Sequence, residues 1–247
     1  MRTLKLTIQY DGTAYVGWQR QAEGTSIQAL IEDALAPIEG GAVTIQGAGR
    51  TDAGVHALGQ VASVRLATSL DAATLLRALN AVLPDDVRVT AVDEAAHDFH
   101  ARFASTGKTY EYRIVNAPFV SPFLFRYVWH VPQPLDIGAM RAAARALEGK
   151  HDFAAFQGAG SLVHSTERTI EAFEWEDARH VDRPIVMRLT GDGFLRHMVR
   201  NVAGTLVEVG SGRWPPRRVL QVLESRSRSC AGPTAPPHGL FLVKVRY

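Results

Sequence analysis

The chain has 247 residues, of which 46% are hydrophobic and 21% are charged, a composition typical of a soluble globular protein with a sizeable core. Its single cysteine, Cys230, excludes an internal disulfide and a cysteine-based zinc site, and no apolar run reaches the roughly 18 residues of a membrane span. The formal net charge is only +2, and the N-terminus alternates like a strand and not like a signal peptide, so we expect a cytoplasmic protein.

This small charge is unevenly distributed along the chain. Residues 1–105 hold 8 Lys or Arg and 12 Asp or Glu, whereas residues 106–247 hold 19 and 13. A basic half suits a polyanionic partner, although a solvated surface explains so small a surplus nearly as well.

The first half predicts a split βαβ unit. Apolar and polar residues alternate in the expected strands, and apolar residues recur at helical spacing in the expected helices. In chain order these elements are a strand at 3–10, a helix at 26–38, strands at 43–46 and 60–66, a helix at 71–83 and a strand at 87–92. The order β-α-β-β-α-β makes an antiparallel sheet with two helices on one face.

The second half repeats this pattern of elements without repeating the residues. We expect strands at 105–114, 127–131, 166–176, 185–190 and 240–245, and helices at 136–147, 193–209 and 215–225. The predicted fold class is α+β: two ferredoxin-like halves, 1–105 and 106–247, that form a mixed, mostly antiparallel sheet with helices on one face and a central cleft. Clefts of this kind are where ligand sites tend to lie.

The stretch from Gln46 to Val61 is the most informative part of the sequence. It places four glycines around Arg50, Thr51 and Asp52. Glycine permits turns with positive φ and the close approach of another backbone, and a nearby arginine can hold a carboxylate ionised and aim it. These residues predict a reaction centre at Asp52 with Arg50 beside it. The alternative is a turn in which Asp52 caps its own backbone and Arg50 is solvated.

Two nucleotide-binding motifs are excluded at this loop. A P-loop needs Lys followed by Ser or Thr after its second glycine, and that pair is missing here. A dinucleotide fingerprint needs a third glycine at the position of Asp52 and a helix after it, whereas 60–66 has the pattern of a strand. Upstream, the segment 15–21 mixes aromatic residues with arginine, which suits either stacking on RNA bases or packing in the core.

The run Gly-Arg-Thr-Asp-Ala-Gly-Val-His-Ala at 49–57 closely resembles the signature of the tRNA pseudouridine synthase A family. Further segments resemble that family in the same order, namely 99–103 with 108–112, then 194–201, and the closing strand with 245–247. The resemblance implies that Asp52 is the catalytic residue, that Tyr110 packs against the target base and that Arg200 is the active-site arginine. From the residue pattern alone, Tyr110 would simply pack in its strand and Arg200 would be solvated.

The activity that the resemblance implies is isomerisation of uridine to pseudouridine in tRNA, in the anticodon stem-loop at positions 38, 39 and 40. This reaction needs a carboxylate, a pocket for the detached base and a flipped nucleotide, and it needs no cofactor or metal. Asp52, Tyr110 and Arg200 would supply the carboxylate, the ring and a cation that pairs with Asp52. The resemblance also implies that the protein works as a homodimer.

Two other classes of protein remain as alternatives. One is an RNA-binding module without catalysis, because split βαβ sheets with exposed aromatic residues bind single-stranded RNA, although the aromatic-rich signature strand of that module is missing. The other is a phosphate-binding hydrolase, against which the missing Lys-Ser or Lys-Thr argues. Release of tritium from carbon-5-labelled uridine in tRNA would separate all three.

Overall fold

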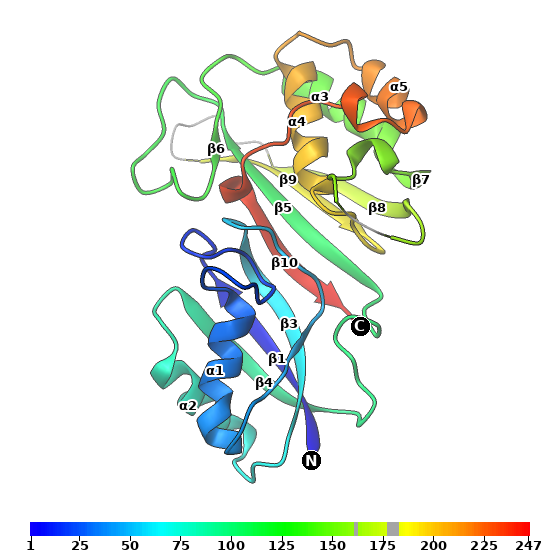
Figure 1. Cartoon of the computed structure of the whole chain (residues 1–247). Helices are drawn as coiled ribbons and strands as arrows, with labels where there is room; N and C mark the ends of the chain where they lie inside the picture. Colours follow the sequence, from blue (N-terminus) through cyan, green and yellow to red (C-terminus); the bar gives the residue numbers. More distant parts are fainter. Residues whose placement is uncertain (161–162, 177–182) are drawn as a thin grey trace. The chain divides into compact units, whose positions relative to one another are not determined.

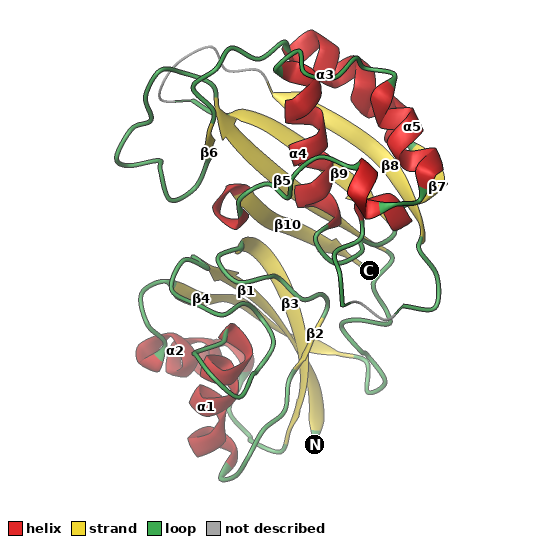
Figure 2. Cartoon of the chain, turned by 45° about the horizontal axis from the view of Figure 1, so that its top comes forward, coloured by secondary structure: helices red, strands yellow, loops and turns green. Residues whose placement is uncertain are grey.

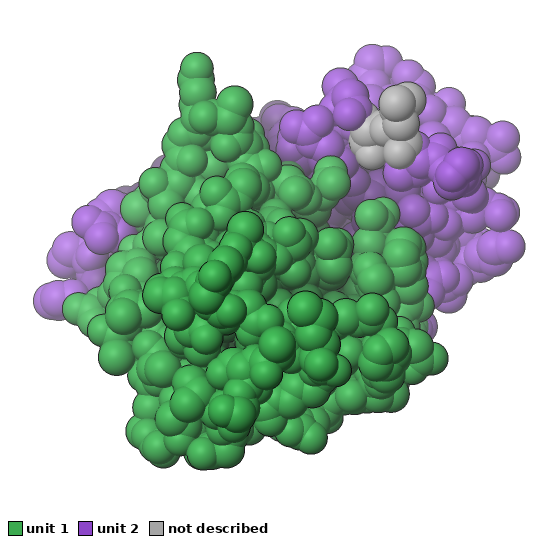
Figure 3. Space-filling model, turned by 60° about the horizontal axis from the view of Figure 1, so that its bottom comes forward, with its two compact units in different colours: residues 1–106, 241–247 green, residues 107–240 purple. Residues whose placement is uncertain are grey.

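The computed structural model describes residues 1–160, 163–176 and 183–247. The chain divides into two compact units, which Figure 3 colours separately: unit 1 comprises residues 1–106 and 241–247, and unit 2 comprises residues 107–240. The closing strand, which the sequence groups with the second half, belongs by its contacts to unit 1.

Unit 1 contains the strand order β4-β1-β3-β10, with the short β2 beside β3. The strands are β1 (Arg2–Tyr10), β2 (Gln46–Gly47), β3 (His56–Leu66), β4 (Val87–Ala95) and β10 (Leu240–Arg246). The strand β1 is antiparallel to both β3 and β4, whereas β10 runs parallel to β3. The helices α1 (Ile27–Glu39) and α2 (Ala72–Val82) cover one face of these strands (Figures 1 and 2).

The helices of unit 1 begin where the sequence supplies a cap. The Ser26 hydroxyl accepts the Ala29 N–H at 3.2 Å, and the Asp71 carboxylate accepts the Thr74 N–H at 2.8 Å, so each satisfies a backbone donor that the first helical turn leaves unpaired. The core packs between these helices and the strands. Its fully buried members include Leu4, Leu6, Ile8, Ile27, Ile31, Leu35, Leu75 and Leu79.

Unit 2 contains the antiparallel order β5-β9-β8-β7, with β6 parallel to β5. Its strands are β5 (Gly107–Val115), β6 (Trp129–His130), β7 (Gly149–Asp152), β8 (Glu167–Glu176) and β9 (Ile185–Gly191). Its helices are α3 (Ile137–Ala144), α4 (Met198–Gly210) and α5 (Arg218–Ser225), with single 3-10 turns at Arg145–Leu147, Ala154–Phe156, Arg228–Cys230 and Pro237–Gly239. The three α-helices cover one face of the strands (Figure 2).

The predicted α+β class is confirmed, with the helices on one face in each unit. Two boundaries differ from the prediction for identifiable reasons. The strand β3 begins at His56 and not at residue 60, because His56 pairs with Phe241 from the far end of the chain. The helix α4 begins at Met198 and not at residue 193, because His197 takes the left-handed conformation (φ 59°). No helix in the described ranges is long and apolar enough to cross a membrane.

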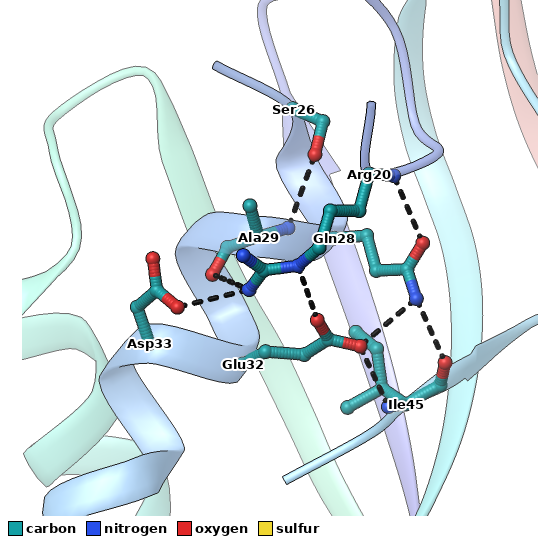
Figure 4. A network of polar contacts seen from close by, with 7 residues as sticks. All are labelled: Arg20, Ser26, Gln28, Ala29, Glu32, Asp33 and Ile45. Atoms are coloured by element: carbon teal, nitrogen blue, oxygen red, sulfur yellow. Dashed lines mark hydrogen bonds and ion pairs between the residues drawn. The ribbon is translucent and has the colours of Figure 1, made fainter. Parts of the chain in front are cut away.

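A buried carboxylate ties three segments of unit 1 together (Figure 4). Glu32 of α1 accepts hydrogen bonds from Arg20 Nε at 2.9 Å, from Gln28 Nε2 at 2.9 Å and from the Ile45 N–H at 3.0 Å. The Arg20 guanidinium also reaches the exposed Asp33 at 2.9 Å. Arg20 follows the segment that leaves β1, and Ile45 immediately precedes β2, so α1 anchors both chain segments that approach the Asp52 loop.

Substitution of Glu32 by Ala is expected to lower the free energy of unfolding of unit 1 by at least about 2 kcal/mol, because each buried donor left unpaired costs about 1–3 kcal/mol. The measurement is equilibrium urea unfolding followed by circular dichroism. The matched control is Asp33→Ala, which removes the exposed partner of the same Arg20 and should cost less than about 1 kcal/mol. Equal losses in the two variants would contradict the role assigned to Glu32.

Candidate active site

The loop between β2 and β3 carries Asp52, whose side chain is half-buried between the buried Thr51 and the exposed Ala53. Backbone hydrogen bonds fix the loop on both sides of this residue. The Thr51 carbonyl accepts the Trp18 N–H at 3.1 Å, and the Asp52 carbonyl accepts the Val55 N–H at 3.1 Å. Backbone hydrogen bonds of Thr51 and Asp52 therefore help to hold the segment that carries the carboxylate.

Two glycines in the segment that follows β1 allow this segment to lie close to the backbone of the Asp52 loop. Gly17 has φ of 103°, and a β-carbon there would lie 2.5 Å from the Thr51 carbonyl oxygen and 3.0 Å from the Asp52 carbonyl carbon. A β-carbon on Gly12 would lie 2.0 Å from the Val55 carbonyl oxygen. Any side chain at either position would therefore displace the loop around Asp52.

Trp18 answers the question that the sequence left open for the segment 15–21. Its side chain is only 2% exposed, and its ring lies against Gly47, where a β-carbon would come within 2.4 Å of the indole nitrogen. Tyr15 is buried as well. The aromatic residues of this segment are therefore buried, as expected for the second of the two interpretations, packing in the core.

Buried polar side chains support the loop from below. The Tyr10 hydroxyl and the Thr51 hydroxyl share a hydrogen bond of 2.8 Å, and Gln60 Nε2 donates to the Gly49 carbonyl at 2.8 Å. A phenol is neutral at pH 7 at its ordinary pKa, and burial raises the pKa of Tyr10 further, so it stays neutral under alkaline conditions as well. Tyr10 therefore fixes the loop by hydrogen bonding without placing a negative charge near Asp52.

His56 has a structural position at the start of β3. Its ring is buried and stacks on Phe241 with the centroids 4.6 Å apart. Its Nδ1 lies 3.0 Å from the Gly12 backbone nitrogen and 3.1 Å from an Asp11 carboxylate oxygen, so it can accept from the one or, when protonated, donate to the other. Either contact ties β3 to the turn after β1. In the described ranges, no group of three or more His, Cys, Asp or Glu side chains could hold a metal ion.

Arg50 and Asp52 lie in the same loop of unit 1, and the Arg50 side chain is exposed. The other two predicted site residues, Tyr110 and Arg200, belong to unit 2. Tyr110 lies in β5 with only 8% of its surface exposed, and its ring meets the edge of the Phe194 ring at a centroid distance of 5.0 Å. Tyr110 and Phe194 thus form an aromatic pair.

Arg200 lies in the first turn of α4 and is held by the loop that precedes β10. Its Nε donates to the Ala235 carbonyl at 2.8 Å, while the Ala235 N–H donates to the Arg200 carbonyl at 3.1 Å. Arg196, one helical turn earlier in the sequence, is exposed and precedes the helix, where it donates to the Ala159 carbonyl at 2.9 Å. The two arginines are therefore distinct: the Ala235 carbonyl orients the Arg200 guanidinium through Nε, whereas the exposed Arg196 donates through Nη1.

The side chain next to Arg200 holds the same loop. Asn201 is fully buried, and its Nδ2 donates to the Phe156 carbonyl at 2.8 Å. Its Oδ1 accepts from the Thr234 hydroxyl at 2.6 Å and from the Arg228 guanidinium at 3.2 Å. The segment 228–235 is thereby fastened to α4 at Arg228 and Thr234, on the N-terminal side of the Ala235 that binds Arg200.

Two titratable side chains near Arg200, Tyr112 and His238, have shifted pKa values that keep them neutral at pH 7. Burial raises the pKa of the Tyr112 phenol, and the nearby positive charge of Arg200 only partly opposes this. Burial also lowers the pKa of His238, an effect that the charge of Arg200 reinforces. The Tyr112 hydroxyl donates to the Pro236 carbonyl at 2.8 Å. Neither side chain therefore carries a negative charge beside the guanidinium.

Comparison with known proteins assigns these residues to a family. The family model described as tRNA pseudouridine synthase matches residues 6–104 and 143–247, which is most of the chain. The chain belongs to the tRNA pseudouridine synthase family. The matched ranges include the Asp52 loop and α4 with Arg200, whereas Tyr110 falls between them.

Relatives of this family match along the whole chain. The tRNA pseudouridine synthase A of Geobacter sulfurreducens is 46% identical over 247 residues, which cover all of both chains. The protein of the same name from Myxococcus xanthus is 47% identical over all of this chain and 92% of its own length. The protein from Syntrophotalea carbinolica is 44% identical over all of this chain and 97% of its own. As a member of the tRNA pseudouridine synthase family, the protein is an isomerase that acts on uridine in tRNA.

The sequence does not predict the residues that support the Asp52 loop and the Arg200 segment, although some of them have an unusual residue type for their position. Gly12 and Gly17 follow the first strand five residues apart, and Gln60 is a polar residue in a strand that is otherwise mostly apolar. Tyr10 looks like an ordinary strand residue, and Asn201 gives no local sign that it is buried. Their roles depend on contacts with segments distant in the sequence, which no local pattern displays.

Proposed function

We propose that this isomerase converts uridines 38, 39 and 40 of the tRNA anticodon stem-loop to pseudouridine, with Asp52 as the nucleophile. The observation that carries the proposal is the construction of the Asp52 loop. Backbone hydrogen bonds hold this loop, and the missing side chains of Gly12 and Gly17 leave space for it. The hydroxyl of the neutral Tyr10 forms a hydrogen bond with Thr51 in the loop. A nucleophile needs this kind of fixed position, because orientation supplies a large share of a rate enhancement.

The chemistry requires no co-reactant. The bond between the base nitrogen and the ribose carbon breaks, the base turns, and the same ribose carbon bonds to carbon 5 of the ring. The hydrogen on carbon 5 leaves as a proton, and the released nitrogen takes one up, so atoms and electrons balance. The Asp52 carboxylate adds to the substrate and departs again, as carboxylates do in retaining glycosidases.

In our proposal, the other site residues contact the target base or place a positive charge near the reacting groups. The ring of Tyr110, already paired with Phe194, offers an aromatic surface to the target base. Arg200 supplies a positive charge in a fixed plane, and Arg50 acts on Asp52 from the same loop. The nucleotide must leave its stack to reach these groups.

The experiment is tritium release from tRNA transcripts labelled at carbon 5 of uridine, followed by mapping of the modified positions. Release with pseudouridine at positions 38 to 40 is the expected result. Product found only in the T-arm would overturn the proposed positions, and the absence of release from a folded enzyme would overturn the proposed reaction.

We also propose that the enzyme works in the cytoplasm as a homodimer. One subunit of 27.0 kDa is small beside a tRNA, whose anticodon arm and elbow lie far apart. A two-fold pair would let one subunit react while the other holds the rest of the substrate. Light scattering should report twice the mass of one chain, and a fully active monomer at the assay concentration would contradict the dimer.

Binding of tRNA is expected to weaken steeply with added salt, because each neutralised phosphate releases counterions. Candidates in residues 106–247 are Arg196, Arg213, Arg217 and Arg218. Both Arg213 and Arg217 are exposed, but Arg213 also pairs with Glu208 through two of its guanidinium nitrogens, at 2.5 and 2.7 Å. The substitution Arg217→Ala should therefore lower the slope of log affinity against log salt by about 1, and Arg213→Ala should lower it less.

The measurement is a filter-binding titration of a tRNA transcript at several salt concentrations. The pair of variants controls for the loss of a positive charge in general, since both remove one arginine. A wild-type affinity that barely responds to salt would refute the electrostatic proposal.

A further inference from the structure

The turn between β4 and β5 exposes a phenylalanine ring that the reaction described above does not use. Phe103 is 78% exposed, and it is the only strongly exposed phenylalanine of unit 1, all of whose residues are described. It belongs to the run Phe99-His100-Ala101-Arg102-Phe103, one of the segments that carry the family resemblance. The ring is flanked by the side chains of His100 and Arg102, which can also stack on a flat ring.

The turn beneath this ring is rigid. The Ala104 N–H donates to the His100 carbonyl at 2.9 Å, and the Arg102 N–H donates to His100 Nδ1 at 3.1 Å. The fully buried Ala101 is fastened from two sides, since its N–H donates to Ser63 Oγ at 3.1 Å and its carbonyl accepts the Tyr247 hydroxyl at 2.9 Å. The exposed ring therefore projects from a backbone already fixed by β3 and by the C-terminal residue.

Three side chains form a cluster on this turn. The His100 and Phe103 ring centroids lie 4.3 Å apart, and the Arg102 guanidinium carbon lies 5.8 Å from the Phe103 centroid. The exposed fraction of Phe103 means that these neighbours leave most of the ring uncovered. Nearby, the Arg65 guanidinium donates to the His97 carbonyl at 2.9 Å, and Asp98 is the one acidic residue of the segment 96–104.

We infer that His100, Arg102 and Phe103 form a stacking platform for an unpaired base of the RNA substrate. This inference rests on the proposed function, which supplies an RNA partner. An aromatic ring stacks on any base, and a guanidinium beside it adds a cation–π contact and meets the phosphate of the same nucleotide. Because the turn is fixed before binding, ordering it costs little when the base arrives.

A protein partner fits this cluster less well. Protein interfaces bury a contiguous apolar centre formed by several large side chains. Phe103 is one ring among polar and charged neighbours, whereas Phe119, Phe123 and Phe125 are all exposed within a single loop of unit 2. The cluster of His100, Arg102 and Phe103 exposes a single phenylalanine ring, which is enough surface for one stacked base and too little for the apolar centre of a protein interface.

The test compares Phe103→Ala and Phe103→Trp with the wild-type enzyme, using a tRNA transcript and a blunt RNA duplex of similar length. Loss of one stacked base should weaken tRNA binding by about tenfold in Phe103→Ala. Duplex binding should not change, because a paired base is not available to stack. The KM for tRNA should rise while kcat stays near the wild-type value, and Phe103→Trp should keep the wild-type affinity.

The Phe103→Trp variant also reports the contact directly. Its additional indole fluorescence, measured as the difference from the wild type, should be quenched by tRNA and not by the duplex. Val82→Ala is the matched control, since Val82 is another apolar side chain of unit 1 that is 66% exposed, and its affinity for tRNA should be unchanged.

Unchanged tRNA affinity in Phe103→Ala, or no quenching in Phe103→Trp, would overturn the platform. Equal weakening of tRNA and duplex binding would overturn it as well, because the duplex offers no unpaired base whose stacking Phe103→Ala could remove. Tritium release by the wild-type enzyme, measured in the same series, separates the two proposals. If the wild type releases tritium and Phe103→Ala binds normally, only the platform fails; if the wild type releases none, the proposed function fails.

Discussion

The Asp52→Asn variant is expected to bind tRNA like the wild type and to form pseudouridine at least about a thousandfold more slowly, since removing a nucleophile removes most of the catalysis. The amide keeps the shape of the side chain but cannot act as a carboxylate nucleophile. The loop should keep its position, because the hydrogen bonds that fix it run through the backbone of Thr51 and Asp52. Single-turnover tritium release measures the rate, and filter binding measures the affinity.

The matched control for this variant is Asp93→Asn. Asp93 is an exposed carboxylate of β4 that pairs with Lys5 at 3.1 Å, so its loss changes the charge of unit 1 by the same amount. This control should retain wild-type activity. Substantial activity in purified, folded Asp52→Asn would remove Asp52 from the catalytic role.

The Arg200→Lys variant is expected to lose about a hundredfold in rate, the typical cost of removing one oriented group that stabilises charge. In the wild type, Arg200 Nε is engaged by the Ala235 carbonyl while the rest of the guanidinium carries the charge in a fixed plane. A lysine has one nitrogen for both tasks, so it either keeps the loop contact or offers its charge to the reaction. Folding should survive, because Asn201 still fastens the loop.

Arg196→Lys is the control for this arginine. Arg196 is exposed and lies before α4, so exchanging its guanidinium for an ammonium should leave the rate of tritium release nearly unchanged. If Arg200→Lys were as active as Arg196→Lys, the fixed plane of Arg200 would have no part in the reaction.

Local patterns predicted most of the helices and strands of the fold. The helix α1 was expected at 26–38 and spans Ile27–Glu39, because Ser26 caps it and apolar residues recur along one face. The predicted strands are wrong where pairing with a segment distant in the sequence determines whether a strand forms. The strand 43–46 is reduced to Gln46–Gly47, and β7, formed only by pairing with β8, was not predicted.

The candidate site could be predicted only in part. Asp52 stood out because glycines and an arginine surround it in the sequence. Arg200 and Tyr110 rested on the resemblance, because each sits in an element whose own pattern suggests an ordinary role. Local sequence patterns do not predict the groups that hold the Asp52 loop. The contacts of Tyr10 with Thr51 and of Gly17 with the same loop join positions more than 30 residues apart.

Gly12 and Gly17 bear on how inactive variants of this enzyme should be interpreted. Neither glycine carries a functional group, yet a methyl group at either would collide with the peptide units that present Asp52. A random mutagenesis screen for loss of turnover would therefore recover them alongside the true reactive residues. Second-site revertants would distinguish the two kinds of position, because a misplaced loop can be rescued by shifting its neighbours, whereas a missing carboxylate cannot.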